Sequence, residues 1–312
     1  MSSPAIPPSR VQLKGCSVGA NPIIWSNDDF SELGGELTLE RCLSDMRDAG
    51  YAGSELGNKY PRTADALGKV LAAHQLRLVS GWHSTHFAER SLADEEAAFR
   101  RHLDLLSALG ATVAIVAECS RAVHGRRDAA LGFGAAALEL TEAEWPKVTS
   151  GLTRLAALTA ERGMKLVYHH HMGTVIQSRS SLDRLLAGVP AMHLLFDPGH
   201  LAFAGIDPLA VLAAHGQRVG HVHLKNVRPA IVERATRERW SFCRAVTEGV
   251  FTIPGDGKPG DGSVDFPAIF QELARLHYRG WLVVEAEEDP AKAEPTAKAH
   301  RARAYVREHA GI

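Results

Sequence analysis

The sequence alternates short apolar runs of β-strand length with amphipathic stretches of helical length along almost its whole course. This pattern predicts an α/β fold with a parallel sheet whose strands are joined by right-handed helical crossovers. The runs with strand character cover residues 13–19, 51–56, 76–81, 112–118, 165–171, 192–197, 219–225 and 280–287. Eight such units in 312 residues predict a closed (β/α)8 TIM barrel. A dinucleotide-binding sheet is disfavoured because no GxGxxG motif follows the first strand.

The predicted barrel forms one domain, because no linker rich in Pro, Gly or Ser divides it. We expect a flexible tail over residues 1–11 and a single catalytic domain over 12–312. The segment 226–265, between the seventh and eighth strands, is too long for a simple loop. It contains a predicted helix over 231–248 that we expect to lie over the barrel mouth, and a polar helix closes the chain.

The same segment contains the sequence PGDGKPGDG at residues 254–262, in which a PGDG unit occurs twice. It matches no phosphate-binding loop pattern. We interpret it as a local insertion at the mouth of the barrel.

Charge and hydropathy argue against nucleic acid and membrane as partners. The formal net charge is −1 and the calculated isoelectric point about 7.0, so no polyanion-binding surface is indicated. No apolar run approaches the roughly 18 residues of a membrane span. The first ten residues lack the apolar region of a signal peptide.

Polar side chains follow most of the predicted strands at their carboxyl ends, where TIM barrels carry their active sites. These residues are Asn21, Glu55, His83, Glu118, His169, His171, Asp197, His223 and Glu285. Burying so many polar groups without compensation would cost several kcal/mol. A divalent cation would satisfy them together, and the mixture of nitrogen and oxygen donors suits Mn, Co, Fe or Zn better than Ca.

Alternation along a strand sorts the three consecutive histidines of KLVYHHHMGT (165–174). Successive side chains point to opposite faces of a sheet, so His169 and His171 share one face and His170 takes the other. By the same rule Glu285 and Glu287 share a face. His200, three residues after Asp197, falls in the following turn and could reach the same cavity.

Several motifs resemble those of the inosose dehydratase family, within the superfamily of xylose-isomerase-like barrels. Short motifs common to the superfamily are DPGH (197–200), HVHLKN (221–226) and VVEAE (283–287). The more specific ones are WSNDD (25–29), GSELGNK (53–59) and YHHHMGT (168–174). The resemblance runs from about residue 12 to about residue 305. It implies a cytoplasmic enzyme that needs Mn²⁺ or Co²⁺, and it suggests glutathione as a second cofactor. Barrels of this kind often associate into homo-oligomers.

The resemblance also implies a ligand set. In the superfamily the metal is held by Glu, Asp, His and Glu from the last four strands, and Asp197, His223 and Glu285 match three of these positions. The first Glu has no match, because the His169–His171 segment stands in its place. The fourth ligand is therefore His169, which we prefer, or His171. A second departure is Pro198, where relatives commonly have Thr.

The family's reaction is the dehydration of 2-keto-myo-inositol (scyllo-inosose) to a trihydroxycyclohexane-1,2-dione in myo-inositol catabolism. We expect Glu285 to remove a proton and His171 or His200 to act as acid toward the departing hydroxyl. The alternative is a metal-dependent isomerase or epimerase acting on a ketose. An AP-endonuclease-like hydrolase would need a basic groove, and a degenerate barrel would only bind a ligand.

A second group of residues is expected to line the substrate pocket: Asn21, Trp25, Glu55, Lys59, His83, Glu118 and Lys225. For Glu55, an ion pair with a barrel lysine such as Lys225 is an equal alternative to substrate contact. Glu118 has a structural role as its equal alternative.

Overall fold

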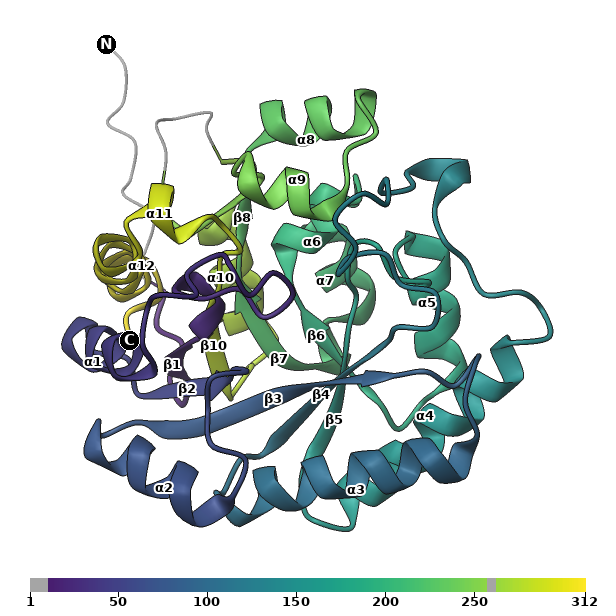
Figure 1. Cartoon of the computed structure of the whole chain (residues 1–312), viewed down its shortest axis with the longest axis horizontal. Coiled ribbons are helices and arrows are strands. Elements are labelled where there is room, and N and C mark those ends of the chain that lie inside the picture. Colours follow the sequence, from purple (N-terminus) through teal and green to yellow (C-terminus); the bar gives the residue numbers. More distant parts are fainter. Residues whose placement is uncertain (1–10, 257–261) are drawn as a thin grey trace.

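The computed structural model describes residues 11–256 and 262–312, and their backbone forms a closed parallel barrel (Figure 1). The strands follow one another around it in the order β1-β10-β7-β6-β5-β4-β3-β2. They are β1 (Ser17–Ala20), β2 (Gly53–Leu56), β3 (Arg77–Thr85), β4 (Val113–Glu118), β5 (Lys165–His169), β6 (His193–Phe196), β7 (Val219–Leu224) and β10 (Trp281–Val284). The predicted eight-stranded TIM barrel is confirmed, with β10 as its eighth strand.

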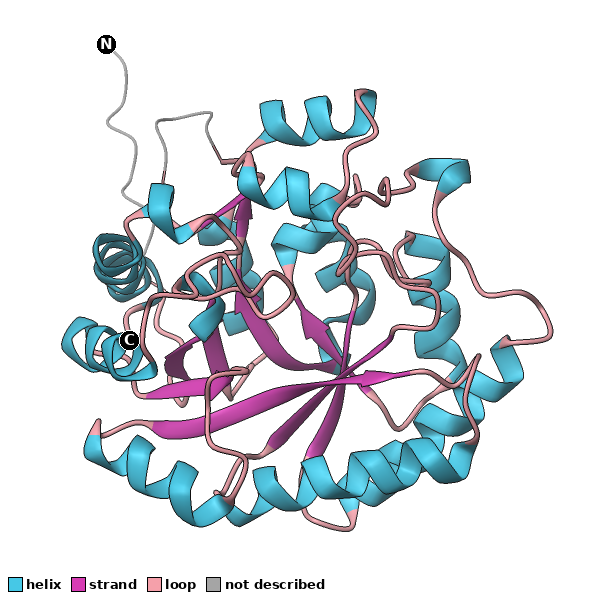
Figure 2. Ribbon diagram, in the orientation of Figure 1, coloured by secondary structure: helices cyan, strands magenta, loops and turns pink. Residues whose placement is uncertain are grey.

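Helices surround the barrel and cover the outward faces of the strands (Figure 2). They are α1 (Leu39–Ala49), α2 (Ala64–Ala73), α3 (Leu92–Ala108), α4 (Trp145–Ala160), α5 (Arg179–Gly188), α7 (Pro208–His215), α10 (Phe266–Arg275) and the C-terminal α12 (Pro295–Ala310). Outward strand residues such as Leu166, Tyr168 and Val222 join one large apolar core with these helices. The inward side chains of Val113, Ile115, Val167 and Leu195 form a smaller cluster inside the barrel. The polar site lies above this packed interior.

The excursion between the last two barrel strands is present, but its predicted single helix over 231–248 is wrong. Two helices occupy the segment, α8 (Pro229–Arg237) and α9 (Phe242–Thr247). The chain breaks at Arg239, whose φ of 53° is left-handed, and Ser241 then caps α9 by accepting from the Arg244 N–H. Residues 226–227 (β8) and 251–252 (β9) form an antiparallel pair that closes the excursion.

Three helices, α10 and the short α6 (Pro198–Phe203) and α11 (Pro290–Ala293), are not among the helices that the sequence predicts. Asp197 ends β6 and caps α6, since its Oδ1 accepts from the His200 N–H at 3.0 Å. Pro198 occupies the first helical position, where a backbone N–H has no partner inside the helix. The departure from Thr at this position therefore removes no needed hydrogen bond. Helix α11 precedes α12.

Residues 1–10 of the predicted flexible tail lie outside the described residues, and so do residues 257–261 of the duplicated PGDG loop. Among the helices of the described ranges, none has the length and apolar character needed to cross a membrane.

Candidate active site

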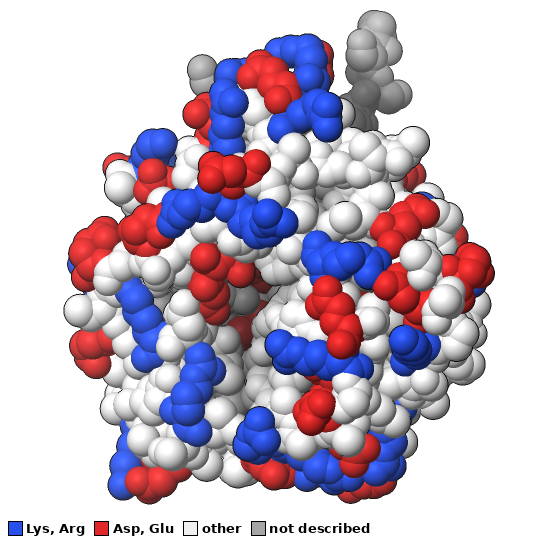
Figure 3. Space-filling view, turned by 45° about the vertical axis from the view of Figure 1, so that its right-hand side comes forward, with Lys and Arg blue, Asp and Glu red and all other residues white. Residues whose placement is uncertain are grey.

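A cavity of about 160 Å³ opens at the carboxyl ends of the barrel strands. On the molecular surface, acidic side chains gather in a hollow (Figure 3). The cavity is lined by Asn21, Ile23, Asp28, Asp29, Glu55, Leu56, Arg62, Trp82, Ile115, His124, His169, His171, His223, Glu285 and Glu287. Predicted site residues from both halves of the sequence thus meet at one place.

Three of the four expected ligands, His169, His223 and Glu285, line this cavity, and the fourth, Asp197, is buried beside them. His223 Nδ1 lies 2.6 Å from Glu285 Oε2 and 3.5 Å from Asp197 Oδ2. His169 Nε2 lies 3.5 Å from the same Asp197 oxygen. Because Asp197 Oδ1 caps helix α6, Oδ2 is the oxygen left to face the two imidazoles. Asp197 Oδ2 and His223 Nδ1 are buried, and neither makes a hydrogen bond of regular geometry among the described residues.

The run of three histidines divides as strand alternation predicts. His169 and His171 line the cavity, whereas His170 points away from it and places Nε2 2.5 Å from the Gln177 carbonyl oxygen. His169 Nδ1 lies 2.7 Å from the carbonyl oxygen of His170, so this nitrogen carries the proton and Nε2 is free to bind a cation. His171 Nε2 instead lies 3.9 Å from Glu287 Oε1. The geometry favours His169 over His171 as the fourth ligand.

Lys225 is fully buried beside the carboxylates. Its Nζ lies 2.6 Å from Glu285 Oε1, 2.7 Å from Glu287 Oε1 and 3.7 Å from Asp197 Oδ2. Burial by itself would lower the pKa of Lys225, but these carboxylates keep the pKa above its ordinary value. The lysine is therefore charged, and it holds one oxygen of each glutamate in place.

The donor set fits a divalent cation. Four carboxylates, those of Glu55, Asp197, Glu285 and Glu287, are buried with the single ammonium group of Lys225 among the described residues around them. Although burial lowers the pKa of His223, the charges of Glu285 and Glu55 raise it well above its ordinary value. The pocket thus attracts positive charge, and a cation at His223 Nδ1 would replace that proton.

Two aspartates from the loop after β1 stand at the mouth of the cavity. Asp29 Oδ1 lies 4.0 Å from His124 Nε2, and the Asp29 side chain is 30% exposed. Desolvation by the surrounding protein, followed by the charge of Glu287, raises the pKa of Asp29 to about 7. Desolvation likewise raises the pKa of Asp28 to about 6. Both side chains can therefore carry a proton close to neutral pH.

The sequence matches the family model described as xylose isomerase-like TIM barrel over residues 43–309. It is 43% identical over 297 residues to inosose dehydratase of Clostridium perfringens, covering 95% of this chain and 98% of that protein. It is 44% identical to inosose dehydratase of Geobacillus thermodenitrificans, again over 95% of this chain and 97% of that protein. The chain belongs to the inosose dehydratase family.

Solved structures with the same fold are more distant from this member of the inosose dehydratase family. The IOLI protein with a bound zinc atom has a TM-score of 0.66 at 14% identity, covering 95% of this chain and all of that one. The probable 3-DHS dehydratase AsbF of Bacillus anthracis has a TM-score of 0.64 at 14% identity, over 93% and 98% of the two chains. D-allulose 3-epimerase of Methylomonas sp. has a TM-score of 0.64 at 18% identity, over 97% and 98%. These likenesses establish the fold.

Trp25, in the WSNDD motif, and Lys59, in the GSELGNK motif, were predicted to bind substrate, but both lie outside the cavity. The Trp25 ring is fully buried, and its Nε1 donates to Asp45 Oδ2 on α1 at 2.9 Å. Lys59 Nζ donates to the carbonyl oxygens of Gly34, at 2.8 Å, and Leu37. The structure therefore does not bring these two side chains to the cavity, and both fix the loop that follows β1.

His83 and Glu118, which were also expected at the substrate pocket, do not line the cavity either. Strand β3 continues to Thr85, so His83 lies within the strand and points outward, where its ring meets Phe99 of α3 at a centroid distance of 5.3 Å. Glu118 accepts hydrogen bonds from Thr85 Oγ1 and from the Phe87 N–H. It closes the β3–α3 connection, which is the structural alternative.

His200 does not line the cavity, in contrast to its predicted role as an acid. Its Nδ1 accepts from the Met172 N–H at 3.2 Å, and its Nε2 lies 2.9 Å from Lys225 Nζ. Burial and the Lys225 charge hold the pKa of His200 well below its ordinary value. Burial and the neighbouring imidazoles do the same to the pKa of His171. Neutral rings at both positions argue against either one as proton donor.

Asp28, Asp29, Trp82, His124 and Glu287 are among the cavity residues that were not predicted as part of the site. Strand alternation gives a signal for two of them. Trp82 faces the cavity because its neighbour His83 faces the helices, and Glu287 shares the inward face of Glu285. The aspartates stand in the WSNDD motif directly after β1. His124 lies in a long loop whose course no periodic pattern reveals.

Proposed function

We propose that this chain is a metal-dependent hydro-lyase that removes water from 2-keto-myo-inositol to give a trihydroxycyclohexane-1,2-dione. The observation that carries the proposal is a nitrogen- and oxygen-donor cluster at the mouth of a barrel that belongs to the inosose dehydratase family. The expected substrate is an uncharged polyol ketone, which suits a polar cavity. Membership in the family also supports a place in myo-inositol catabolism and a cytoplasmic location.

His169, Asp197, His223 and Glu285 would hold the cation, and we propose Mn²⁺ or Co²⁺. When bound, a divalent cation stabilises negative charge that develops on a ketone oxygen. The zinc in the IOLI structure supports metal binding by this fold.

The first chemical step is removal of the proton next to the ketone. We assign this step to Glu285, which lines the cavity and is held by Lys225 and Asn21. Glu287 is the competing base, because its Oε2 has no hydrogen-bond partner among the described residues. In either case the C–H electron pair moves toward the ketone, and the proton stays on the carboxylate.

The second step is loss of the β-hydroxyl, which needs a proton to leave as water. Asp29 lines the same cavity with a pKa raised to about 7, so much of it is protonated at neutral pH. We assign the acid role to Asp29 in place of the neutral imidazoles. The resulting unsaturated ketone carries an enolic hydroxyl, and its tautomerisation gives the 1,2-dione.

An epimerase acting on a ketose is the alternative. The superfamily pattern has Glu at the first of its four ligand positions, whereas this chain has the His169–His171 segment there and places the His169 imidazole beside Asp197. This difference favours elimination over return of the proton.

The test offers the Mn²⁺-loaded enzyme 2-keto-myo-inositol and, separately, a panel of ketoses. We expect a 1,2-dione from the inosose and no epimers from the ketoses. Epimers from a ketose without dione formation from the inosose would refute the proposal.

A further inference from the structure

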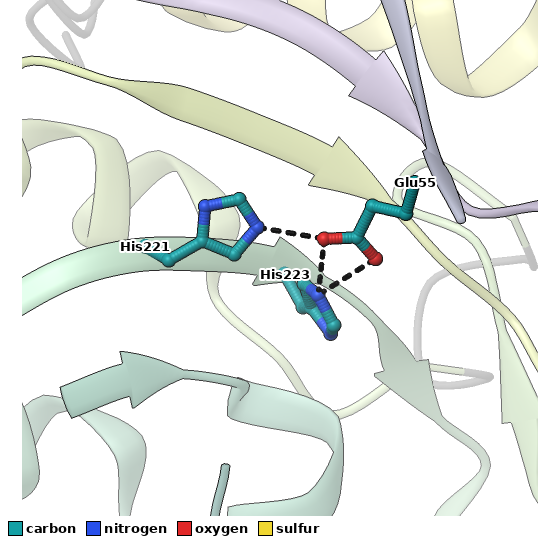
Figure 4. A group of neighbouring side chains, drawn as sticks. All are labelled: Glu55, His221 and His223. Atoms are coloured by element: carbon teal, nitrogen blue, oxygen red, sulfur yellow. Dashed lines mark hydrogen bonds and ion pairs between the residues drawn. The ribbon is translucent and has the colours of Figure 1, made fainter. Parts of the chain in front are cut away.

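Glu55, at the end of β2, is fully buried and receives hydrogen bonds from several strands at once. Its Oε1 lies 2.6 Å from Ser80 Oγ, 2.8 Å from His221 Nε2 and 3.3 Å from His223 Nε2 (Figure 4). Its Oε2 accepts from Asn21 Nδ2 at 2.7 Å. The carboxylate is thus held by donors that come from the end of β1 and from within β3 and β7.

His223 uses its two ring nitrogens on opposite sides. Nε2 faces Glu55, at 3.2 Å from Oε2 and 3.3 Å from Oε1. Nδ1 faces Asp197 and Glu285, but it makes no hydrogen bond of regular geometry among the described residues. A carboxylate on one imidazole nitrogen fixes the proton there and leaves the lone pair on the other. In Figure 4 the His221 ring reaches the same Glu55 oxygen from the same strand.

We propose that Glu55 is a positioning residue for the cation site, which acts through His223. By accepting the Nε2 proton, Glu55 holds His223 in the tautomer whose Nδ1 lone pair points at the space between Asp197 and Glu285. His221 donates to the Glu55 carboxylate and so restrains it rather than binding the cation. This inference rests on the proposed metal site.

Two other roles for Glu55 fit part of the geometry. Glu55, His221 and His223 are close enough to form a second cation site of their own. Glu55 also lines the cavity and could contact the substrate directly. A second cation would have to displace the Nε2 protons of both histidines. It would also compete with the Ser80 hydroxyl, which already donates to Glu55 Oε1. The positioning role uses every one of the contacts.

The test is cobalt titration of the metal-free protein, followed by visible absorption and by competition with a chelator. Wild type is expected to bind one equivalent. E55Q removes the charge and E55A the acceptor, and each is expected to weaken Co²⁺ binding by about 10- to 100-fold and to alter the cobalt spectrum. E118Q removes a buried carboxylate that lies outside the cavity, and it is expected to bind cobalt as wild type does. E55D serves if E55Q does not fold, and it is expected to weaken binding as well.

A double-mutant comparison tests the route through His223. In an H223A background, E55Q is expected to cause no further loss of cobalt affinity. A further loss of cobalt affinity in the H223A background would overturn the inference. Wild-type affinity in folded E55Q or E55D would also overturn it. So would two equivalents of bound cobalt in wild type with one of them lost in E55Q. Failure of wild type to bind cobalt would refute the proposed metal site itself, which is a different result.

Discussion

At the residue scale, His169 and His171 share a face of β5 but have different neighbours. His169 Nε2 faces Asp197, whereas His171 Nε2 faces Glu287. We therefore predict that H169A weakens binding of Mn²⁺ or Co²⁺ by more than about 100-fold, beyond the range for groups that only support a ligand. H171A should retain affinity within about tenfold of wild type. Isothermal titration of the metal-free variants measures both, and the reverse order would assign the fourth ligand to His171.

Asp29 gives the reaction a predicted pH dependence. An acid must be protonated to act, and the pKa of Asp29 is raised to about 7. Turnover of the metal-saturated enzyme should therefore fall as pH rises through about 7. D29N should lower turnover by about 100-fold or more and abolish that fall. A D29N enzyme with the wild-type pH profile would exclude Asp29 as the proton donor.

His83 links a single side chain to acid stability. Burial, and then the neighbouring His102, lower the pKa of His83 to about 3, against about 6.5 in an unfolded chain. The folded state thus disfavours the proton, so this stabilising contribution is complete above pH 6.5 and is lost as pH falls toward 3. The free energy of unfolding can be measured with urea at pH 8 and at pH 5. Between these pH values, H83F should lose about 1–2 kcal/mol less of it than wild type does. Equal losses would contradict the assignment.

At the scale of elements, helix α6 sets the position of Lys225. A Cβ at Gly199 would lie 2.6 Å from Lys225 Cγ and 2.8 Å from its Cβ, and the lysine is completely buried. G199A should therefore displace the ammonium group from Glu285 and Glu287. We expect a loss of about 1–3 kcal/mol in stability and at least tenfold lower turnover. The control is G68A in α2, where the nearest atom would be 3.2 Å away and helix propensity favours alanine. Equal thermal melts and rates for the two variants would contradict this role of α6.

The strands and helices also show how much of the fold could be predicted from the sequence. All eight barrel strands follow from apolar runs, and alternation places His169, His170 and His171 correctly, because side-chain direction in a strand is a local property. The same rule fails at His83, since β3 continues four residues past its predicted end at residue 81. The break between α8 and α9 depends on a left-handed Arg239, a residue type that gives no local signal for it.

The roles of Glu55 and Lys225 could not be predicted from spacing. Both residues belong to buried charge clusters whose members lie far apart in the sequence. Their partners are the inward side chains of other strands that lie at the same level of the barrel. A Glu55–Lys225 ion pair was one of the two alternatives for Glu55, but Glu55 pairs with His221 and His223, and Lys225 pairs with Glu285 and Glu287.

At the scale of the whole molecule, barrel closure brings β1 next to β10 and so joins both ends of the chain at one site. Residues after β1 supply Asp28 and Asp29, whereas the carboxyl ends of β5, β6, β7 and β10 supply the four proposed metal ligands. The excursion containing α8 and α9 adds Phe242, whose ring lies 5.3 Å from that of His171 between centroids. The cavity therefore depends on the complete barrel, which brings the proposed metal ligands and the acidic loop after β1 together.

The most direct test of this account is turnover of 2-keto-myo-inositol before chelation, after chelation and after return of metal. Dione formation should fall to background when the metal is removed, and it should recover when about one equivalent of Mn²⁺ or Co²⁺ is restored. The H169A variant, treated in the same way, should need far more metal to recover any rate. Undiminished dione formation by a protein shown to be metal-free would contradict the central claim.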